Sequence, residues 1–406
     1  MRVFQINTTF GEGSTGRIAE EIGNILVENG HQCCIAYGRG QKEGKVDLYR
    51  IGNQTDFLIH GFVSLLFDRH GLASKGATKR LIKKIIDWKP DVIHLHNIHG
   101  YYLNYRDLFS FFQSVEIPVI WTFHDCWPFT GHCTYFDNVN CRKWIDGCYA
   151  CPKTRKYPRS LIVDRSKGNY FDKKQAFTTL KNLTVVTPSQ WLQSLTRLSF
   201  FKNCNILTIH NGIHTGIFKA QELPLAASIA NQVKGRKIIL GVANIWDARK
   251  GLNEFIRLSL LVSNDYVIVL VGLEKNREEN FPANILCIGR TNDASGLSSL
   301  YANSFVFVNP TWQDNFPTTN IEALACGTPV ITYQTGGSPE AVDSETGAVV
   351  AKGDVVGIWN AIKEFALKDQ AKLRAGCRQR ALAMFDKDLR FNDYLSLYKQ
   401  LTSTNT

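Results

Sequence analysis

The sequence predicts an α/β protein built from two doubly wound domains. Short apolar runs alternate with helical patterns along almost the whole chain, which is typical of a mostly parallel sheet with helices on its faces. The 406 residues exceed the size at which one hydrophobic core stops growing, so two domains of about 200 residues each are expected. An apolar fraction of 44% and a charged fraction of 20% exclude a largely disordered or collagen-like protein.

The first domain is expected over residues 1–214. Its predicted strands are RVFQIN, QCCIAY, DVIHL, VIWTF, LTVVT and NILTIH, and its helices are expected near residues 15–29, 56–69 and 75–88 and after Ser189. Residues 126–165 interrupt the alternation and are rich in cysteine, so we expect them to form an irregular insertion.

The second domain is expected over residues 235–387, with strands KIILGV, YVIVLVG, FVFVNP, PVIT and GAVV. Residues 215–234 contain no periodic pattern and include Pro224, which predicts a linker. Residues 388–406 are expected to form a C-terminal helix that can cross back to the first domain. In such a pair of domains a ligand is expected in the crevice between them, outside the carboxyl ends of the strands.

The excess of basic over acidic residues is confined to the first domain. Residues 1–220 carry 28 Lys and Arg against 17 Asp and Glu, whereas the rest of the chain carries 19 of each, and the formal net charge is +11. This asymmetry predicts an anionic partner, which can be nucleic acid, a phosphorylated substrate or an acidic lipid surface. The lysines at 75, 79 and 83 lie at helical spacing and are explained either by a solvated helix face or by attachment to anionic lipid.

No apolar run approaches the roughly 20 residues of a membrane-spanning helix. The nearest run, Phe57–Phe67, is short and is interrupted by His60. A predicted strand follows Met1 directly, in place of a basic stretch and an apolar segment, so no secretory signal is expected and the protein is expected in the cytoplasm.

Four of the eleven cysteines cluster in the insertion. Cys133, Cys141, Cys148 and Cys151 form a C-x7-C-x6-C-x2-C pattern. Because a reducing compartment disfavours disulfides, clustered cysteines point to metal binding, and four thiolates can close a tetrahedral zinc site. The alternative is a set of scattered reduced thiols.

A glycine-rich turn follows the first predicted strand. Gly11, Gly13 and Gly16 read as GxGxxG before a helix, a pattern that can hold phosphate on backbone N–H groups and makes Gly13, Thr15 and Gly16 candidate phosphate ligands. Three residues separate the predicted strand from Gly11, and no acid closes the second strand. Both points disfavour dinucleotide binding. Proximity to a phosphate stays the favoured interpretation, and a plain turn is the alternative.

The most informative segment is NPTWQDNFPTTNIEALACGTPV, residues 309–330. It places Asp314 in a loop and Glu322 in the second turn of a predicted helix. Carboxylates of this kind hold sugar hydroxyls, while the free N–H groups at a helix start face a phosphate. The N–H groups expected to do so are those of Thr318, Thr319 and Asn320. The implied ligand is a sugar nucleotide.

This segment resembles the retaining glycosyltransferases of family 4 with the GT-B fold, particularly those of bacterial exopolysaccharide, colanic-acid and O-antigen assembly. Asp314–Glu322 looks like the family's E-x7-E element with Asp in the first position, and ALACGTPVIT and Gly336–Glu340 continue it in register. The resemblance, which covers almost the whole chain, implies a GT-B fold. It also implies that Glu322 holds the nucleotide ribose and Asp314 contacts the donor sugar.

Two further elements carry the resemblance. Trp246–Gly251 looks like the family's lysine-glycine element, in which Lys250 would neutralise the leaving diphosphate. Ile245 stands where most members have an arginine, and Arg249 is the candidate to replace it, although an exposed basic pair would also explain Arg249 and Lys250. His124 resembles the crevice histidine that contacts the donor sugar.

The spacing of His94, His96 and His99 suggests a metal site, but strand alternation argues against it because His99 lies beyond the strand end. His96 and Asn97 are instead candidates for the acceptor side.

The resemblance implies a retaining glycosyltransferase that needs no metal or other cofactor for catalysis. It would use a nucleoside diphosphate sugar as donor and a lipid-linked saccharide as acceptor, and it would be cytoplasmic or peripheral on the inner face of the cytoplasmic membrane. Three alternatives remain at this stage. They are a GT-B nucleotide-sugar epimerase, an NADP-dependent oxidoreductase that uses Gly11, Gly13, Gly16 and Arg39, and a nucleic-acid-binding protein.

Overall fold

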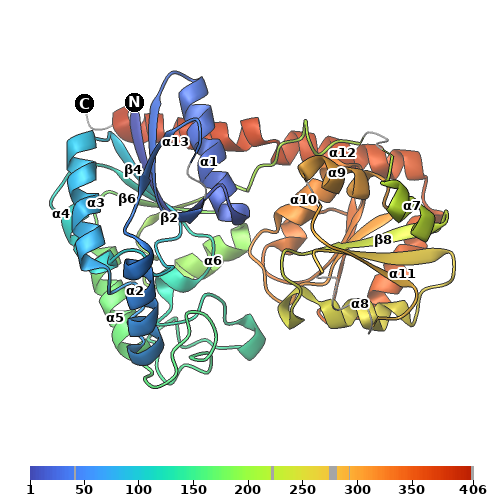
Figure 1. Ribbon diagram of the computed structural model, residues 1–406, viewed down its shortest axis with the longest axis horizontal. Coiled ribbons are helices and arrows are strands. Elements are labelled where there is room, and N and C mark those ends of the chain that lie inside the picture. The colour runs from blue at the N-terminus through green and yellow to red at the C-terminus, as the bar shows by residue number, and fades with distance from the viewer. Residues whose placement is uncertain (41–42, 221–223, 274–280, 292, 404–406) are drawn as a thin grey trace. The chain divides into compact units, whose positions relative to one another are not determined.

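A computed structural model describes residues 1–40, 43–220, 224–273, 281–291 and 293–403. These residues form two compact units, the first comprising 1–210 and 391–406 and the second comprising 211–390. Each unit contains a fully parallel sheet with connecting helices (Figure 1). The two doubly wound α/β domains expected from the sequence are therefore confirmed.

Within the described residues, the first unit has a seven-stranded sheet of order β3-β2-β1-β4-β5-β6-β7. The strands are β1 (Arg2–Phe10), β2 (Gln32–Gly40), β3 (Asp47–Arg50), β4 (Val92–Leu95), β5 (Val119–Thr122), β6 (Leu183–Thr187) and β7 (Asn205–Thr208). The helices are α1 (Gly13–Glu28), α2 (Gln54–Phe67), α3 (Lys75–Trp88), α4 (Tyr105–Gln113), α5 (Ser166–Thr178) and α6 (Gln190–Leu198), with α13 (Lys387–Ser403) from the chain end and the short 3-10 turns η1 (Trp127–Phe129) and η2 (Asp137–Val139).

Side chains of alternate residues of β1 pack into two separate hydrophobic cores, one on each face of the first sheet. Val3 packs with residues of α1 and α13, whereas Phe4 packs with residues of α3 and α4. The C-terminal helix is fixed to this unit by polar contacts as well, since the buried His94 accepts or donates a hydrogen bond with Tyr398 Oη at 2.6 Å and with Thr122 Oγ1 at 2.8 Å. His94 therefore has a structural role.

Within the described residues, the second unit has a six-stranded sheet of order β10-β9-β8-β11-β12-β13. The strands are β8 (Lys237–Val242), β9 (Tyr266–Val271), β10 (Ile285–Ile288), β11 (Val306–Asn309), β12 (Val330–Tyr333) and β13 (Gly347–Val350). The helices are α7 (Ala227–Val233), α8 (Leu252–Ser259), α9 (Ala294–Ala302), α10 (Thr318–Ala325), α11 (Val355–Leu367) and α12 (Gln370–Phe385), with 3-10 turns η3 (Ala248–Lys250) and η5 (Ser338–Ala341).

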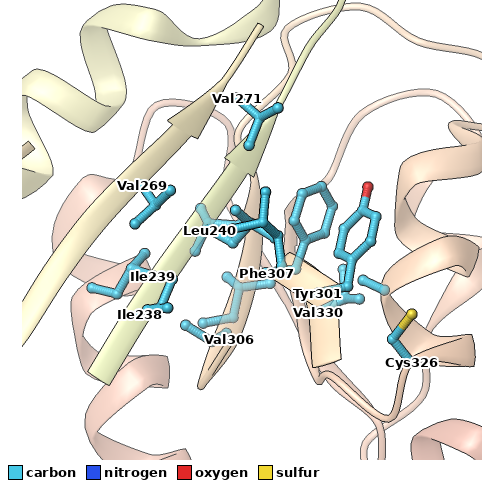
Figure 2. Packing of buried hydrophobic residues seen from close by; sticks show 14 of the residues in the cluster. Ile238, Ile239, Leu240, Val269, Val271, Tyr301, Val306, Phe307, Cys326 and Val330 are labelled. Atoms are coloured by element: carbon cyan, nitrogen blue, oxygen red, sulfur yellow. The ribbon is translucent and has the colours of Figure 1, made fainter. Parts of the chain in front are cut away.

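The core of the second unit lies on the central strands of this sheet. Figure 2 shows side chains of β8, such as Leu240, beside Phe307 of β11. On the other side of Phe307 lies Tyr301 of α9, with ring centroids 5.4 Å apart. All three side chains are completely buried or nearly so. This packing sets the ends of β8 and β11, from which the polar loops of the unit emerge.

Several sequence expectations differ from the structure. β1 continues to Phe10, beyond the expected RVFQIN, and the edge strands β3 and β10 were not expected. The expected linker, 215–234, lies in the second unit and contains α7, whereas its residues 221–223 are outside the described residues. Residues 404–406 of the expected C-terminal helix are also outside them.

In the described part of the chain, no helix is both long and apolar enough to cross a bilayer.

Candidate active site

In the second unit, Lys250 lies in a tight turn after β8. The Asp247 carboxylate accepts the backbone N–H of Lys250 at 3.0 Å and so begins η3. Gly251 has a φ of 79°, and a Cβ at that position would lie only 2.3 Å from the carbonyl oxygen of Pro310. A glycine is therefore required where this turn touches the loop that follows β11.

That loop carries Asp314, which pairs with Lys250. The Lys250 Nζ lies 2.5 Å from Asp314 Oδ2, and the two side chains are 23% and 17% exposed. A backbone hydrogen bond also holds the turn of Lys250 against the loop of Asp314, because the Arg249 carbonyl accepts the Trp312 N–H at 2.8 Å. Arg249 itself donates from Nη1 to the carbonyl of Gln313 at 3.3 Å. The structure thus brings Arg249 and Lys250 of one sequence motif together with Asp314 of another.

Glu322 lies in α10 and is buried, with 8% of its surface exposed. Its carboxylate contacts Tyr301. The Tyr301 hydroxyl donates a hydrogen bond to Glu322 Oε2 at 3.2 Å. Burial, followed by the charge of Glu322, raises the pKa of the fully buried Tyr301 well above its usual value. Tyr301 therefore remains protonated and acts as a permanent donor that fixes the carboxylate. The sequence analysis did not identify Tyr301.

The glycine-rich segment after β12 packs against the loop of Asp314. Gly336 has a φ of 56°, and a Cβ there would lie 1.8 Å from the Asp314 carbonyl oxygen. The N–H of Gly337 donates to the carbonyl of Asn315 at 2.7 Å. Close approach of the two backbones therefore explains why glycines follow the acidic segment.

The start of α10 offers fewer free N–H groups than expected. The N–H of Asn320 donates to the Pro317 carbonyl at 3.2 Å, and its side chain is buried, with Nδ2 donating to Ser338 Oγ at 2.9 Å and Oδ1 accepting from Asn309 at 2.7 Å. The expectation that the Asn320 amide is free to meet a phosphate is therefore wrong. Thr318 and Thr319, both half-buried, hold the first amides of the helix, which lack intrahelical acceptors.

In the first unit, the glycine turn follows β1 without a gap. The expected three-residue separation is wrong, because Thr8, Thr9 and Phe10 are part of the strand. Gly13 begins α1 with a φ of 67°, and a Cβ on Gly16 would lie 3.0 Å from Thr9 Oγ1. The turn is thus closely packed on the end of its own strand.

Asn7 connects this turn to the loop after β4. Its Nδ2 donates to the carbonyl of Thr15 at 3.1 Å, and its Oδ1 accepts the N–H of Asn97 at 3.2 Å. Asn7 is completely buried, so its side chain is positioned by the sheet. Polar residues at the ends of two neighbouring strands are joined through it, although the sequence analysis did not identify Asn7.

His96 and His124, from the ends of β4 and β5, form a stacked pair. His96 Nδ1 lies 3.1 Å from His124 Nε2, and the rings are 5.4 Å apart with planes inclined by 17°. His96 Nε2 also lies 2.8 Å from Oε1 of Gln5. Burial lowers the pKa of His124 to about 4 and that of His96 well below its usual value, so both rings are neutral near pH 7. Two candidates are therefore brought together as neutral hydrogen-bonding groups.

A second polar pair lies beside them. His99 Nε2 lies 2.9 Å from Asp125 Oδ2, and His99 Nδ1 lies 3.0 Å from the Tyr157 hydroxyl. Both His99 and Asp125 are buried. The pair is not contained in any one sequence motif, although Asp125 directly follows His124 at the end of a predicted strand and could have been found as a candidate from that position.

Cys133, Cys141, Cys148 and Cys151 of the insertion line one small cavity, together with Phe136 and Trp144. Cys148 Sγ accepts the N–H of Gly131 at 3.1 Å. A hydrogen bond from the thiol of Cys133 lowers the pKa of Cys151 to about 7. Within the described residues, no three His, Cys, Asp or Glu side chains are grouped so as to hold a metal ion. The zinc site stays a prediction.

Two family models match the chain. The model described as "Glycosyltransferase Family 4" matches residues 15–216, and the model described as "Glycosyl transferases group 1" matches residues 236–367. The second range contains Lys250, Asp314 and Glu322.

One relative matches the chain over its full length, and two solved structures share its fold. The putative colanic acid biosynthesis glycosyl transferase WcaC of Escherichia coli strain K12 is 26% identical over 99% of this chain and 100% of its own. Sucrose-phosphate synthase from Thermosynechococcus elongatus has a TM-score of 0.71 at 17% identity over 99% of each chain. HepE of Anabaena, solved in complex with UDP-glucose, has a TM-score of 0.64 at 13% identity and covers 100% of this chain and 99% of its own.

Proposed function

The chain belongs to glycosyltransferase family 4 and has the GT-B fold, and from this premise we propose that it is a retaining enzyme of cell-surface polysaccharide assembly. It transfers a sugar from a nucleoside diphosphate sugar to a lipid-linked saccharide. The observation that carries the proposal is the contact between Lys250 and Asp314, at 2.5 Å, on the same α/β unit as the buried Glu322. A cation for phosphate and carboxylates for hydroxyls are the groups that a sugar nucleotide requires.

Each of these residues has a separate task in the proposal. Glu322, fixed by Tyr301, accepts hydrogen bonds from the ribose hydroxyls. Lys250 neutralises charge on the diphosphate, with the first amides of α10, those of Thr318 and Thr319, as further donors. Asp314 accepts hydrogen bonds from the hydroxyls of the donor sugar.

In the proposed reaction, the bond between the anomeric carbon and the leaving phosphate oxygen breaks. A bond from the anomeric carbon to the acceptor oxygen forms on the same face of the sugar, and the acceptor proton passes to the leaving phosphate oxygen. Lys250 and the helix amides stabilise the charge that develops on the diphosphate. Because these groups carry that charge, the proposal requires no metal in the transfer step.

The first unit is proposed to receive the acceptor, with His96, Asn97 and His124 as its polar groups. Neutral imidazoles are suited to exchanging hydrogen bonds with sugar hydroxyls. The proposed location is cytoplasmic and peripheral on the membrane, and the support for it is that the excess of basic residues falls entirely within residues 1–220, which favours an acceptor linked to an anionic lipid.

The test is a transfer assay with purified protein. Nucleotide sugars that raise the melting temperature are incubated with and without lipid-linked saccharides, and the products are analysed by mass spectrometry and by the anomeric coupling constants in NMR spectra. The proposal expects a glycosylated acceptor with the anomeric configuration of the donor. Inversion of configuration overturns the retaining assignment. A new nucleotide sugar formed without acceptor overturns the transferase assignment in favour of an epimerase, and stabilisation by NADPH alone overturns the donor class.

A further inference from the structure

Helix α2 of the first unit is apolar on the side that faces solvent. Leu58, Ile59 and Phe62 are 61%, 57% and 60% exposed. The inward side instead carries His60, which is completely buried, with Nδ1 2.8 Å from Ser74 Oγ and Nε2 accepting the N–H of Gly71 at 3.0 Å. A surface helix ordinarily has the opposite pattern, with its apolar stripe towards the core.

A segment of the insertion extends this apolar surface. The N–H of Leu161 donates to the carbonyl of Leu65 at 2.8 Å, which places residues 161–163 against the second half of α2. Leu161, Ile162 and Val163 are all exposed, Ile162 by 74%. Exposed Leu58, Ile59 and Phe62 of α2 together with 161–163 are called here the apolar face. Contiguous exposed apolar residues of this kind mark interaction surfaces.

The apolar face is held rigidly. Asp68, at the end of α2, accepts the N–H of Arg165 at 2.9 Å and pairs with His132 at 2.6 Å. Its carbonyl accepts a hydrogen bond from Asn169 at 2.7 Å. Because these contacts fix both the end of α2 and the residues that follow 161–163, the exposed side chains form part of a defined surface.

The surroundings of the apolar face are basic. Residues 152–167 contain six Lys and Arg residues and one acid, Asp164. Arg155, Lys156 and Arg159 in this stretch are exposed. The two carboxylates at the ends of α2 are already engaged, since Asp56 pairs with Arg80 at 3.4 Å and Asp68 pairs with His132. Apolar side chains next to free basic ones match an anionic lipid surface.

Helix α3, the basic helix that the sequence singled out, does not have this combination. Its lysines at 75, 79 and 83 are exposed, but Leu81, Ile85 and Trp88 are buried in the core of the unit. Among the residues of α3, Ile86 is the exposed large apolar side chain, 56% exposed. Helix α3 therefore has exposed positive charge but few exposed apolar side chains that could insert into a bilayer. It provides a matched comparison for α2.

We propose that the apolar face docks on an anionic bilayer. Leu58, Ile59, Phe62 and Ile162 enter the boundary between headgroups and acyl chains, and Arg155, Lys156 and Arg159 contact the headgroup phosphates. The inference rests on the proposed function in one respect: the lipid-linked acceptor proposed there is the reason for the protein to meet a membrane. Docking itself requires neither donor nor acceptor.

The experiment is sedimentation of the full chain with vesicles of phosphatidylcholine, with or without phosphatidylglycerol, at low and high salt. Wild type is expected to bind the anionic vesicles about tenfold or more tightly than the neutral ones. Ile59→Ser, Phe62→Ser and Ile162→Ser combined should weaken binding about tenfold or more at either salt concentration. Arg155→Glu, Lys156→Glu and Arg159→Glu combined should weaken it about a hundredfold at low salt and much less at high salt.

Two controls complete the test. Leu260→Ser with Leu367→Ser removes even more exposed apolar residues of the second unit, 77% and 88% exposed, and should leave binding unchanged. Reversal of Lys75, Lys79 and Lys83 on α3 should weaken it less than reversal of Arg155, Lys156 and Arg159.

Three outcomes overturn the proposal: no preference of the wild type for anionic vesicles, unchanged binding of the Ile59, Phe62 and Ile162 variant, or a dimer of the wild type that this variant converts to monomer. Melting curves of every variant with the nucleoside diphosphate test the proposed function separately, because that site lies in the other unit.

Discussion

The ammonium nitrogen of Lys250 lies 2.5 Å from Oδ2 of Asp314, although the two residues are 64 positions apart in the chain. The resemblance to the family assigns these residues to different parts of the donor, the diphosphate and the sugar. Under the proposed function, this contact means that a bound diphosphate would share the ammonium with Asp314. The two residues would then act on the donor as a pair, and changing either one alters the environment of the other.

Asp314→Asn removes the negative charge but leaves Lys250 free for phosphate. Transfer should fall strongly, whereas the affinity for the nucleoside diphosphate should stay the same or rise. Lys250→Ala should instead weaken diphosphate binding and lower kcat, by about 2 to 4 kcal/mol in activation free energy if it resembles the loss of one preorganised donor. Steady-state kinetics and nucleotide titration measure both effects, with the exposed Lys352→Ala as control. An equal loss of diphosphate affinity in both variants contradicts the separate roles.

Tyr301→Phe tests how Glu322 is held. The variant keeps the aromatic ring in the core and removes only the hydroxyl that donates to Glu322 at 3.2 Å. Donor affinity should fall by about 0.5 to 1.5 kcal/mol, the net contribution of one hydrogen bond. Calorimetric titration with the nucleoside diphosphate gives the result, and Tyr266→Phe, a buried tyrosine of the same unit, is the matched control. If both variants bind the donor as the wild type does, Tyr301 does not position the carboxylate.

The first unit should lose stability in mild acid. Burial lowers the pKa of His60 and His124 to about 4 and that of His94 to about 3, whereas an unfolded histidine titrates near 6.5. Between about pH 6.5 and about pH 4 the unfolded chain binds more protons, so the free energy of unfolding falls as the pH falls. Each such histidine contributes a loss of about 2 kcal/mol by about pH 5.

Urea unfolding across this pH range measures the effect. His94→Gln removes one of these titrating groups and should reduce the slope of the unfolding free energy against pH, even if it also lowers stability at neutral pH. Identical slopes for the variant and the wild type would show that His94 does not titrate as described.

The C-x7-C-x6-C-x2-C pattern of Cys133, Cys141, Cys148 and Cys151 predicts bound zinc. Elemental analysis of protein purified without chelator should find about one zinc per chain, and Cys148→Ser or Cys151→Ser should lower that value. Cys204→Ser, outside the insertion, is the control and should not change it. Protein that contains no zinc, yet has the same melting temperature with and without added zinc, is evidence that the four residues are reduced thiols.

Most of the fold could be predicted because buried parallel strands read as short apolar runs, and α2 and α3 were placed within two residues of their observed ends. The strands that were missed, β3 and β10, lie at sheet edges. β3 is the short sequence DLYR, charged at both ends, because an edge strand need not be buried on both faces. α7 was missed because its seven residues, of which only Val233 is buried, produce no helical periodicity.

The site was predicted only as far as local motifs reach. Asp314 and Glu322 share one segment and could be recognised together, but the contacts of Lys250 with Asp314 and of Tyr301 with Glu322 join separate segments. His99 and Asp125 likewise meet across two strand ends, 26 positions apart. Such pairs depend on strand order, which no single motif specifies.

The central claim is that the acidic segment of the second unit holds the nucleotide part of the donor, and titration of the wild type and of Glu322→Gln with nucleoside diphosphates tests it most directly. The account predicts that one nucleoside diphosphate binds the wild type and that Glu322→Gln, with unchanged melting temperature in the absence of ligand, loses about 1.5 to 3 kcal/mol of binding free energy. The exposed Glu345→Gln should bind as the wild type does. Equal affinity of the wild type and Glu322→Gln for the nucleotide would contradict the account.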